Sequence, residues 1–207
     1  MRVIAGSLRG KLLRSPPGQT TRPVTDRVKQ QIFDRLVSLR RFPPHAQPAV
    51  LDLFSGTGSF GIEALSRGSA WCTFVEHDAQ AAALLRQNLQ DFALLDESSV
   101  LRTSLLSEPG QPATGLPAMP TGPASAFDLI FVDPPYRFSL DCRPVSPVGR
   151  LIDALAPQTA ATALLTLRTQ LGSVVPESLS QWERTHHWAN GTMQVSFFAR
   201  RGPADGV

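Results

Sequence analysis

The stretch LDLFSGTGSFG, residues 51–61, decides the fold because it joins an apolar strand to a helix through a glycine-rich loop. Its glycines have the GxGxxG spacing: Gly56, Gly58 and Gly61. Glycine lets a loop turn tightly and lets backbone N–H groups approach a ligand. Glu76 ends the next apolar run, where a carboxylate can pair with the hydroxyls of a ribose. The stretch therefore predicts a nucleoside cofactor; the alternative is a tight turn with no ligand.

Strand and helix signals alternate along the chain after Pro48. Short apolar runs predict strands, and segments with helical spacing lie between several of them. The predicted strands are 49–54, 71–76, 99–104, 127–132 and 160–167, and the predicted helices lie at 63–67, 78–95 and 148–155. The last stretch, 182–201, predicts an antiparallel hairpin that turns at Asn190-Gly191. This order is typical of an α/β protein whose parallel sheet carries helices on both faces.

A basic arm precedes the α/β region. RVIAG (2–6) and KLLRS (11–15) predict the two sides of a short hairpin, and TDRVKQQIFDRLVSL from Thr25 has apolar residues at helical spacing. Residues 107–126 hold five prolines and three glycines, which predict a surface insertion. The expected organisation is an arm over 1–45, an α/β domain over 46–201 and a tail over 202–207.

Charge is divided unevenly between the arm and the rest of the chain. The 207 residues are 42% hydrophobic and 18% charged, which excludes a wholly disordered, collagen-like or ordinary membrane protein. The net charge of +3 separates into +8 over residues 1–41 and −5 over the rest. A basic end favours contact with a polyanion, although a solvated basic segment has the same composition. The expected RNA-contacting residues are Arg2, Arg9, Lys11, Arg14, Arg22, Arg27 and Lys29.

The sequence has neither the cysteine spacing of a metal site nor the apolar segment of a secretory signal. Cys72 and Cys142 lie seventy residues apart and form no CxxC motif, so we expect reduced, structural thiols. No apolar run near the start is long enough for a secretory signal. We expect a cytoplasmic protein that binds no metal and does not contact a membrane.

Asp52 helps to choose between two nucleoside cofactors. A carboxylate in the strand just before the glycine loop suits a pyrophosphate poorly, but it attracts the ammonium of a methionine moiety. An NAD-dependent dehydrogenase also adds a substrate domain, and only some forty residues follow Arg168. The sequence therefore favours S-adenosylmethionine over NAD.

A second motif, Asp133-Pro134-Pro135-Tyr136, follows the fourth predicted strand. Ligands bind at the carboxyl ends of parallel strands, so we expect this loop and the glycine loop to face one cleft. Two prolines stiffen the loop and supply no N–H, which frees the carbonyl of Pro134 to accept. With the Asp133 carboxylate it can hold a planar NH2 group, while Tyr136 offers a ring for a base to stack on. The alternative is an ordinary turn at the end of a strand.

These residues resemble a known family. The tetrapeptide DPPY with the loop DLFSGTG is similar to the S-adenosylmethionine-dependent methyltransferases that act on exocyclic or amide nitrogens. The arm, RVIAGSLRGKLL and RPVTDRVKQQIFDRL, resembles the opening of the bacterial 16S rRNA methyltransferases that act on N2 of guanine 966. The resemblance implies a Rossmann-like, seven-stranded class I methyltransferase sheet and a 16S rRNA substrate, either naked or within the small ribosomal subunit. We expect the chain to act as a monomer.

The resemblance also implies roles for the loop residues. Asp52, Phe54, Gly56 and Gly58 would hold the methionine end of the cofactor, and Glu76 its ribose. Ser104 departs from the family pattern, because an Asp or Asn usually meets the adenine there. Asp133, Pro134, Pro135 and Tyr136 would form the catalytic loop, in which the first two orient the amine and Asp133 takes its proton after alkylation.

Two other functions remain open at this stage. The DPPY motif reports an NH2 target without naming it, so the substrate could be N6 of a DNA adenine or a glutamine amide of a protein. A non-catalytic RNA-binding module with the same fold is the other alternative. Only the basic arm favours RNA among these targets.

Overall fold

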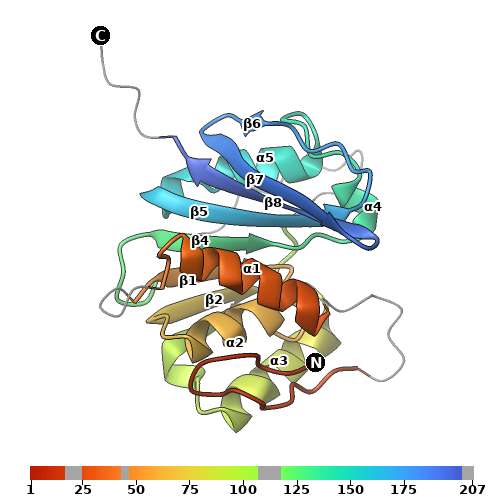
Figure 1. The fold of residues 1–207 in the computed structure, drawn as a ribbon. Helices are drawn as coiled ribbons and strands as arrows, with labels where there is room; N and C mark the ends of the chain where they lie inside the picture. Colours follow the sequence, from red (N-terminus) through yellow and green to blue (C-terminus); the bar gives the residue numbers. More distant parts are fainter. Residues whose placement is uncertain (17–24, 43–46, 107–117, 202–207) are drawn as a thin grey trace. The chain divides into compact units, whose positions relative to one another are not determined.

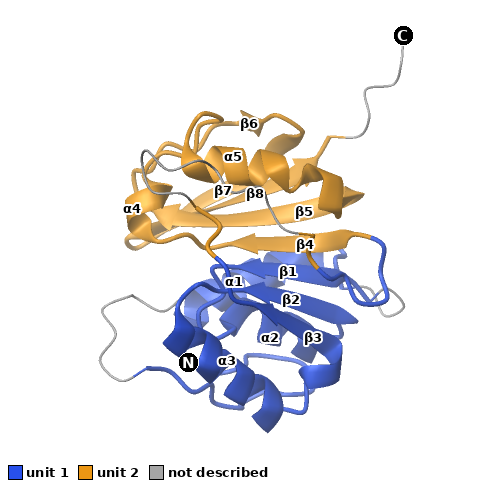
Figure 2. Ribbon diagram, turned by 180° about the vertical axis from the view of Figure 1, so that it is seen from behind, with its two compact units in different colours: residues 1–103, 120–125 blue, residues 104–119, 126–207 orange. Residues whose placement is uncertain are grey.

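The computed structural model describes residues 1–16, 25–42, 47–106 and 118–201. These residues form two compact units, coloured separately in Figure 2. Unit 1 comprises residues 1–103 and 120–125, and unit 2 comprises residues 104–119 and 126–207. The expected division into an arm, a domain and a tail stays a prediction, and the tail lies outside the described residues.

Unit 1 has three parallel strands in the order β3-β2-β1. The strands are β1 (Ala49–Leu53), β2 (Trp71–Val75) and β3 (Ser98–Leu101). The helices that follow β1 and β2 are α2 (Ser59–Ser66) and α3 (Ala79–Asp91), and a 3-10 turn, η1 (Leu95–Glu97), precedes β3. Figure 1 shows α2 next to β2, on the side turned to the viewer. The predicted strand–helix alternation is confirmed for this unit.

The arm begins with a hairpin and continues into helix α1 (Asp26–Ser38). Arg2 and Leu12 form an antiparallel bridge, and the Val3 N–H donates to the Lys11 carbonyl at 2.9 Å. The hairpin is therefore confirmed, although it is held by one bridge instead of two regular strands. Thr25 caps α1 by accepting from the Val28 N–H at 3.3 Å, as a threonine before a helix predicts. The helix buries the side chains of Val28, Ile32, Phe33 and Leu36.

Unit 2 joins one parallel strand pair to an antiparallel ribbon, in the order β4-β5-β8-β7-β6. Its strands are β4 (Phe127–Val132), β5 (Thr159–Gln170), β6 (Ser178–Leu179), β7 (Trp182–Asn190) and β8 (Met193–Arg200). Its helices are α4 (Tyr136–Ser139) and α5 (Pro147–Ala154), with a 3-10 turn, η2 (Ala156–Gln158), before β5. The predicted terminal hairpin is confirmed, since β7 ends at Asn190 and Gly191 follows with φ +59°.

The expected number of strands needs a correction. The resemblance implies seven strands, whereas the described residues form eight. The additional strand, β6, has two residues and pairs with the start of β7. It is too short to produce the alternating pattern by which a strand is predicted.

The predicted insertion is described only in its last part. Residues 107–117 lie outside the described residues, so its exposed character stays a prediction. The carbonyl of Pro120 accepts from the indole N–H of Trp71 at 3.1 Å and also from the Thr73 hydroxyl. The end of this segment is therefore packed against β2.

The described residues also bear on the expectations about membranes, metal ions and cysteines. In the described part of the chain, no helix is long and apolar enough to cross a bilayer. Among the same residues, no group of three His, Cys, Asp or Glu side chains could hold a metal ion. Cys72 and Cys142 are free and buried, as expected for structural thiols, and burial raises the pKa of Cys142 to about 12.

Candidate functional site

The glycine loop of unit 1 turns through left-handed backbone conformations. Phe54, Gly56 and Gly58 have φ values of +59°, +54° and +90°. The Ser55 N–H donates to the Val75 carbonyl at 3.1 Å, and the Gly58 N–H donates to the Ser55 carbonyl at 2.8 Å. These bonds fix the loop between the end of β1 and the start of α2.

Asp52 lies beneath this loop. Its side chain is fully buried, and Oδ2 accepts from the Gly61 N–H at 2.8 Å. The contact ties the strand to the first turn of α2, where a negative charge is favourable. The expected contact of Asp52 with the ammonium of a cofactor stays a prediction, and in this structure the carboxylate holds the loop itself.

Glu76 joins the glycine loop to the end of β2. Its Oε2 accepts from the Gly56 N–H at 2.8 Å, and its Oε1 accepts from the Asp78 N–H at 2.8 Å. Each carboxylate oxygen has further acceptor capacity beyond one N–H. With its two oxygens side by side at the loop, Glu76 is suited to receive the two hydroxyls of a ribose.

The loop has the open space and the polar groups that a nucleoside cofactor needs. A Cβ on Gly56 would meet nothing within 4 Å, so a ligand can lie against the loop there. The hydroxyl oxygens of Ser55 and Ser59 are buried without a hydrogen-bond partner among the described residues. Hydroxyls in that state have hydrogen-bonding capacity left for a bound molecule or for water. Together with Glu76, these groups fit a cofactor that carries a ribose and a polar tail.

Asn88 of α3 connects the glycine loop to the arm, a contact that the sequence does not predict. The side chain is fully buried, and its Nδ2 donates to the Thr57 carbonyl at 3.0 Å. Its Oδ1 accepts from the Arg14 N–H at 2.8 Å, and Nδ2 also donates to the Arg14 carbonyl at 3.3 Å. One amide therefore fixes a residue of the loop and a residue of the arm.

Glu63 of α2 anchors the start of the arm. Its carboxylate accepts from the Ile4 N–H at 2.7 Å and from the Ala5 N–H at 3.0 Å. The same carboxylate lies 3.4 Å from Lys29 Nζ and 2.8 Å from Arg67 Nε. The arm is thus fastened to the helix that follows the glycine loop.

The RNA contact predicted for Lys29 is wrong. Its side chain has no exposed surface, and Nζ donates to the Arg2 carbonyl at 2.6 Å beside Glu63. Burial lowers the pKa of Lys29, and the attraction of Glu63 opposes that change. A phosphate cannot reach this ammonium, so Lys29 serves to hold the arm on α2.

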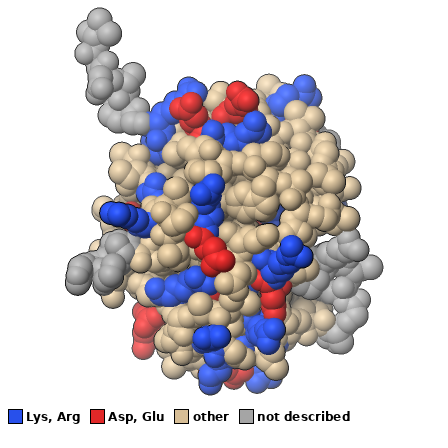
Figure 3. All heavy atoms as spheres, in the orientation of Figure 1, with Lys and Arg blue, Asp and Glu red and all other residues tan. Residues whose placement is uncertain are grey.

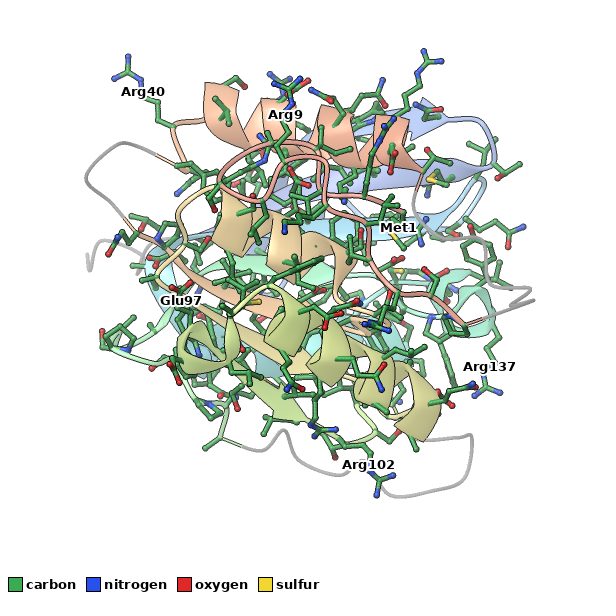
Figure 4. All side chains as sticks on the ribbon, turned by 90° about the horizontal axis from the view of Figure 1, so that it is seen from below. Met1, Arg9, Arg40, Glu97, Arg102 and Arg137 are labelled. Carbon is green, nitrogen blue, oxygen red and sulfur yellow. The ribbon has the colours of Figure 1, made fainter. Side chains whose placement is uncertain are left out.

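The other predicted RNA-contacting residues differ in their surroundings. Arg9, Lys11 and Arg27 are exposed and form no ion pair with a described residue, and Figure 4 labels Arg9 at the hairpin. Arg2 pairs with Asp26 at 3.0 Å and Arg14 with Asp91 at 2.7 Å, both at the surface. Basic and acidic side chains accordingly alternate over the face shown in Figure 3. Arg22 lies outside the described residues.

In unit 2, the DPPY loop leaves the end of β4 and enters the short helix α4. Pro134 is buried and Pro135 is exposed, with φ −52° at the start of the helix. The Pro135 carbonyl accepts from the Phe138 N–H at 2.9 Å. Two consecutive fixed φ angles hold this loop in a single path.

Arg168 of β5 holds the carboxylate of this motif, a contact that the sequence motifs do not predict. Its Nε donates to Asp133 Oδ1 and its Nη2 to Asp133 Oδ2, each at 2.7 Å. Side-chain exposure is 8% for Arg168 and 18% for Asp133. Burial alone would lower the pKa of Arg168, but the charge and hydrogen bonds of Asp133 outweigh it and raise that pKa. An arginine within the apolar run ALLTLRT was the available signal, because a buried arginine requires a partner.

The base-stacking role of Tyr136 and the adenine contact of Ser104 stay predictions. The Tyr136 side chain is half-buried, and its hydroxyl is buried without a hydrogen-bond partner among the described residues. Ser104 lies beyond the end of β3, in unit 2, where its exposed hydroxyl donates to the Leu106 carbonyl at 3.0 Å.

Comparison with known proteins gives the family and a named relative. The family model described as conserved hypothetical protein 95 matches residues 1–199. The chain is 37% identical over 141 residues to a Haemophilus influenzae protein named ribosomal RNA small subunit methyltransferase D. That alignment covers 68% of this chain and 66% of the relative, so it spans slightly less than two thirds of that protein.

Solved structures share the fold over most of the chain. The yhhF structure from Escherichia coli is 25% identical, with a TM-score of 0.74 over 98% of this chain and 99% of that one. An RNA methyltransferase from Salinibacter ruber, in complex with S-adenosyl-L-homocysteine, gives a TM-score of 0.56 over 89% of this chain and 98% of that one. At 14% identity it shows the fold alone. The resemblance drawn from the arm and the two motifs is confirmed: the chain belongs to the family described as conserved hypothetical protein 95 and has the α/β, Rossmann-like fold of class I methyltransferases.

Proposed function

We propose that this chain transfers a methyl group from S-adenosylmethionine to ribosomal RNA, at the exocyclic N2 of a guanine in 16S rRNA. The observation that carries the proposal is the DPPY loop, in which a rigid backbone and a clamped carboxylate present acceptors for an NH2 group. The glycine loop of unit 1 and the name of the Haemophilus influenzae relative support the cofactor and the RNA substrate.

Unit 1 supplies the cofactor-binding residues. Glu76 would receive the ribose hydroxyls, while Gly56 leaves the space that the bound molecule occupies. The loop backbone from Phe54 to Gly58 would hold the methionine end, and Asp52 keeps that loop in shape through the Gly61 N–H. When bound, the cofactor supplies a methyl group on a positively charged sulfur.

Unit 2 supplies the residues that receive the amine. An Asp133 oxygen and the Pro134 carbonyl would each accept one N–H of the amine and so fix its direction. Both oxygens would stabilise the positive charge that develops on nitrogen as the new N–C bond forms. Asp133 would then accept the proton that the alkylated nitrogen loses. Tyr136 would offer its half-buried ring to the base, and the base has to leave any stack in order to reach this loop.

The arm supports RNA as the substrate class. Arg9, Lys11 and Arg27 are exposed cations of a segment that α2 and α3 hold in place. Exposed arginine and lysine contribute sequence-independent affinity through phosphate contacts. Arg137, labelled in Figure 4, adds an exposed cation directly after the DPPY motif.

Radiolabelled S-adenosylmethionine, incubated with the purified chain and a panel of substrates, tests the proposal. The panel contains 16S rRNA, 23S rRNA and small subunits from a strain that lacks this methylation, together with DNA and total protein. We expect label in 16S rRNA or in the small subunit, recovered as N2-methylguanine after digestion. Label in adenine of DNA or in glutamine of protein would favour the other amino-methyltransferase functions. Tight RNA binding without any label would favour a non-catalytic module.

A further inference from the structure

We propose that Arg168 is a positioning residue for the acceptor site: it clamps the Asp133 carboxylate so that its outer lone pairs face the substrate amine. This inference rests on the proposed function, because it concerns the carboxylate to which that function assigns the NH2 group. Arg168 itself acts only through Asp133.

The pairing of β4 with β5 places the two residues together. Val132 lies opposite Leu167 in these parallel strands, and each is followed by one member of the ion pair. The arginine is in the body of β5, whereas the aspartate is the first residue after β4. The regular strand thus supports a residue that belongs to a loop.

The guanidinium is itself held on its other side. Its Nη1 lies 3.7 Å from Met193 Sδ, and Arg168 pairs with Val195 of β8. With only 8% of the side chain exposed, the guanidinium has few alternative rotamers. Two parallel N–H bonds to one carboxylate then fix both the position and the plane of that carboxylate.

This clamp determines which lone pairs Asp133 can offer. A bidentate guanidinium uses one lone pair on each oxygen, and the remaining pair on each oxygen points away from Arg168. Those outer positions can accept an N–H from a planar amine. Without the clamp the carboxylate can rotate about χ2, and a displacement of about 1 Å can reduce a rate by a factor of about 100.

The ion pair also selects the charge of the amine. An isolated carboxylate would attract an alkylammonium, whereas the Asp133–Arg168 pair has no net charge. A neutral NH2 group on a conjugated ring or amide therefore binds without competition from protonated lysine side chains. The chemical class of substrate that fits is a neutral, planar amine.

Kinetics of Arg168 variants test this role. We expect Arg168→Gln to lower kcat by about 100-fold, by the displacement argument, with cofactor Kd and RNA KM changed less than threefold. Arg168→Lys keeps the charge but cannot donate two parallel N–H bonds to the carboxylate. Its kcat should therefore lie between those of the wild type and Arg168→Gln. Gln170→Ala, an exposed position on the same strand, is the matched control and should keep the wild-type rate. Thermal unfolding of each variant verifies that it is folded.

Chemical rescue distinguishes the clamp from general structural damage. Guanidinium ion, at a concentration that leaves the wild-type rate unchanged, should raise kcat of Arg168→Ala, and methylammonium should not. In the double variant Asp133→Asn with Arg168→Gln, the losses should not multiply, because both changes break one interaction. A wild-type kcat in Arg168→Gln, equal rescue by both ions, or fully multiplicative losses would each overturn the inference.

A failure of the proposed function gives a different set of results. If the wild-type chain labels another amine and depends on Arg168 in the same way, the RNA substrate is wrong and the clamp stands. If no substrate is labelled, NMR of the Arg168 Nε–H decides. A slowly exchanging signal that Asp133→Asn abolishes supports the clamp, and a signal that this change does not affect overturns it.

Discussion

Asn88 donates a hydrogen bond from Nδ2 to the carbonyl oxygen of Thr57, 3.0 Å away, inside the glycine loop. The same side chain accepts from the backbone N–H of Arg14 at 2.8 Å. Helix α3 therefore holds the glycine loop and the arm through a single buried amide. A substitution in the glycine loop or in the arm should therefore alter the conformation of the other segment.

Replacing Asn88 should weaken cofactor binding without touching the expected cofactor contacts. Asn88→Ala removes the partner of the buried Thr57 carbonyl and of the part-buried Arg14 N–H, at a cost of about 1 to 3 kcal/mol. We expect cofactor Kd, measured by calorimetry, to rise roughly tenfold. Gln87→Ala, an exposed neighbour on α3, is the control. An unchanged Kd in a folded Asn88→Ala protein would show that this amide does not shape the loop.

Two glycines of the hairpin with the same φ form a matched pair for testing the arm's anchor. Gly6 and Gly10 both have φ +86°, but a Cβ on Gly6 would lie 1.8 Å from the Ser66 carbonyl oxygen, and one on Gly10 would meet nothing within 4 Å. Gly10→Ala should cost about 1 to 2 kcal/mol from the left-handed backbone alone. Gly6→Ala should cost more in urea unfolding, because the hairpin has to move off α2. Equal losses would mean that the hairpin is not seated there.

Two glycines of the GxGxxG pattern, Gly56 in the glycine loop and Gly61 in α2, should affect cofactor binding and stability to different extents. A Cβ on Gly56 enters open space, whereas one on Gly61 would lie 2.2 Å from the ring of Phe74 and 2.5 Å from Cys72 Sγ. We therefore expect Gly56→Val to abolish most cofactor binding, with a loss of about 1 to 2 kcal/mol in stability because φ at this position is left-handed, +54°. Gly61→Ala should lower the free energy of unfolding by about 1 to 3 kcal/mol through overpacking. The melting temperature should fall accordingly. The reverse pattern would place the cofactor elsewhere.

Salt dependence of RNA binding tests the division between surface and buried cations. Arg9→Ala and Lys11→Ala should each weaken binding and reduce the slope of log K against log salt by about 0.7 to 0.9. Lys29→Met should leave that slope unchanged, because Lys29 is buried against Glu63. A smaller slope in Lys29→Met would show that Lys29 contacts RNA, contrary to its burial in the structure.

Much of the fold follows from local patterns in the sequence. Apolar runs locate β1, β2 and β4, Thr25 marks the start of α1, and Asn190-Gly191 marks the final turn. These features depend on neighbours along the chain, so a single sequence displays them. The two-residue β6 and the four-residue α4 are too short for such a pattern.

The sequence predicts several residues of the site but not the tertiary contacts that hold them. Glu76 and the glycine loop are joined by a hydrogen bond, as the GxGxxG pattern with a following acid suggests. Asn88 and Arg168 were missed because their roles depend on tertiary contacts with Thr57 and Asp133. Lys29 was misjudged for the same reason, since a charge on an arm contributes equally to composition whether it is exposed or buried.

Transfer to 16S rRNA by Asp133 variants tests the central claim most directly. The measurement is the single-turnover rate of N2-methylguanine formation, with cofactor Kd determined on the same proteins. Asp133→Ala and Asp133→Asn should bind the cofactor like the wild type and react at least about 100-fold more slowly, as for other groups that stabilise charge in the transition state. Formation of N2-methylguanine at the wild-type rate by both variants, or its absence with the wild-type protein, would contradict the account.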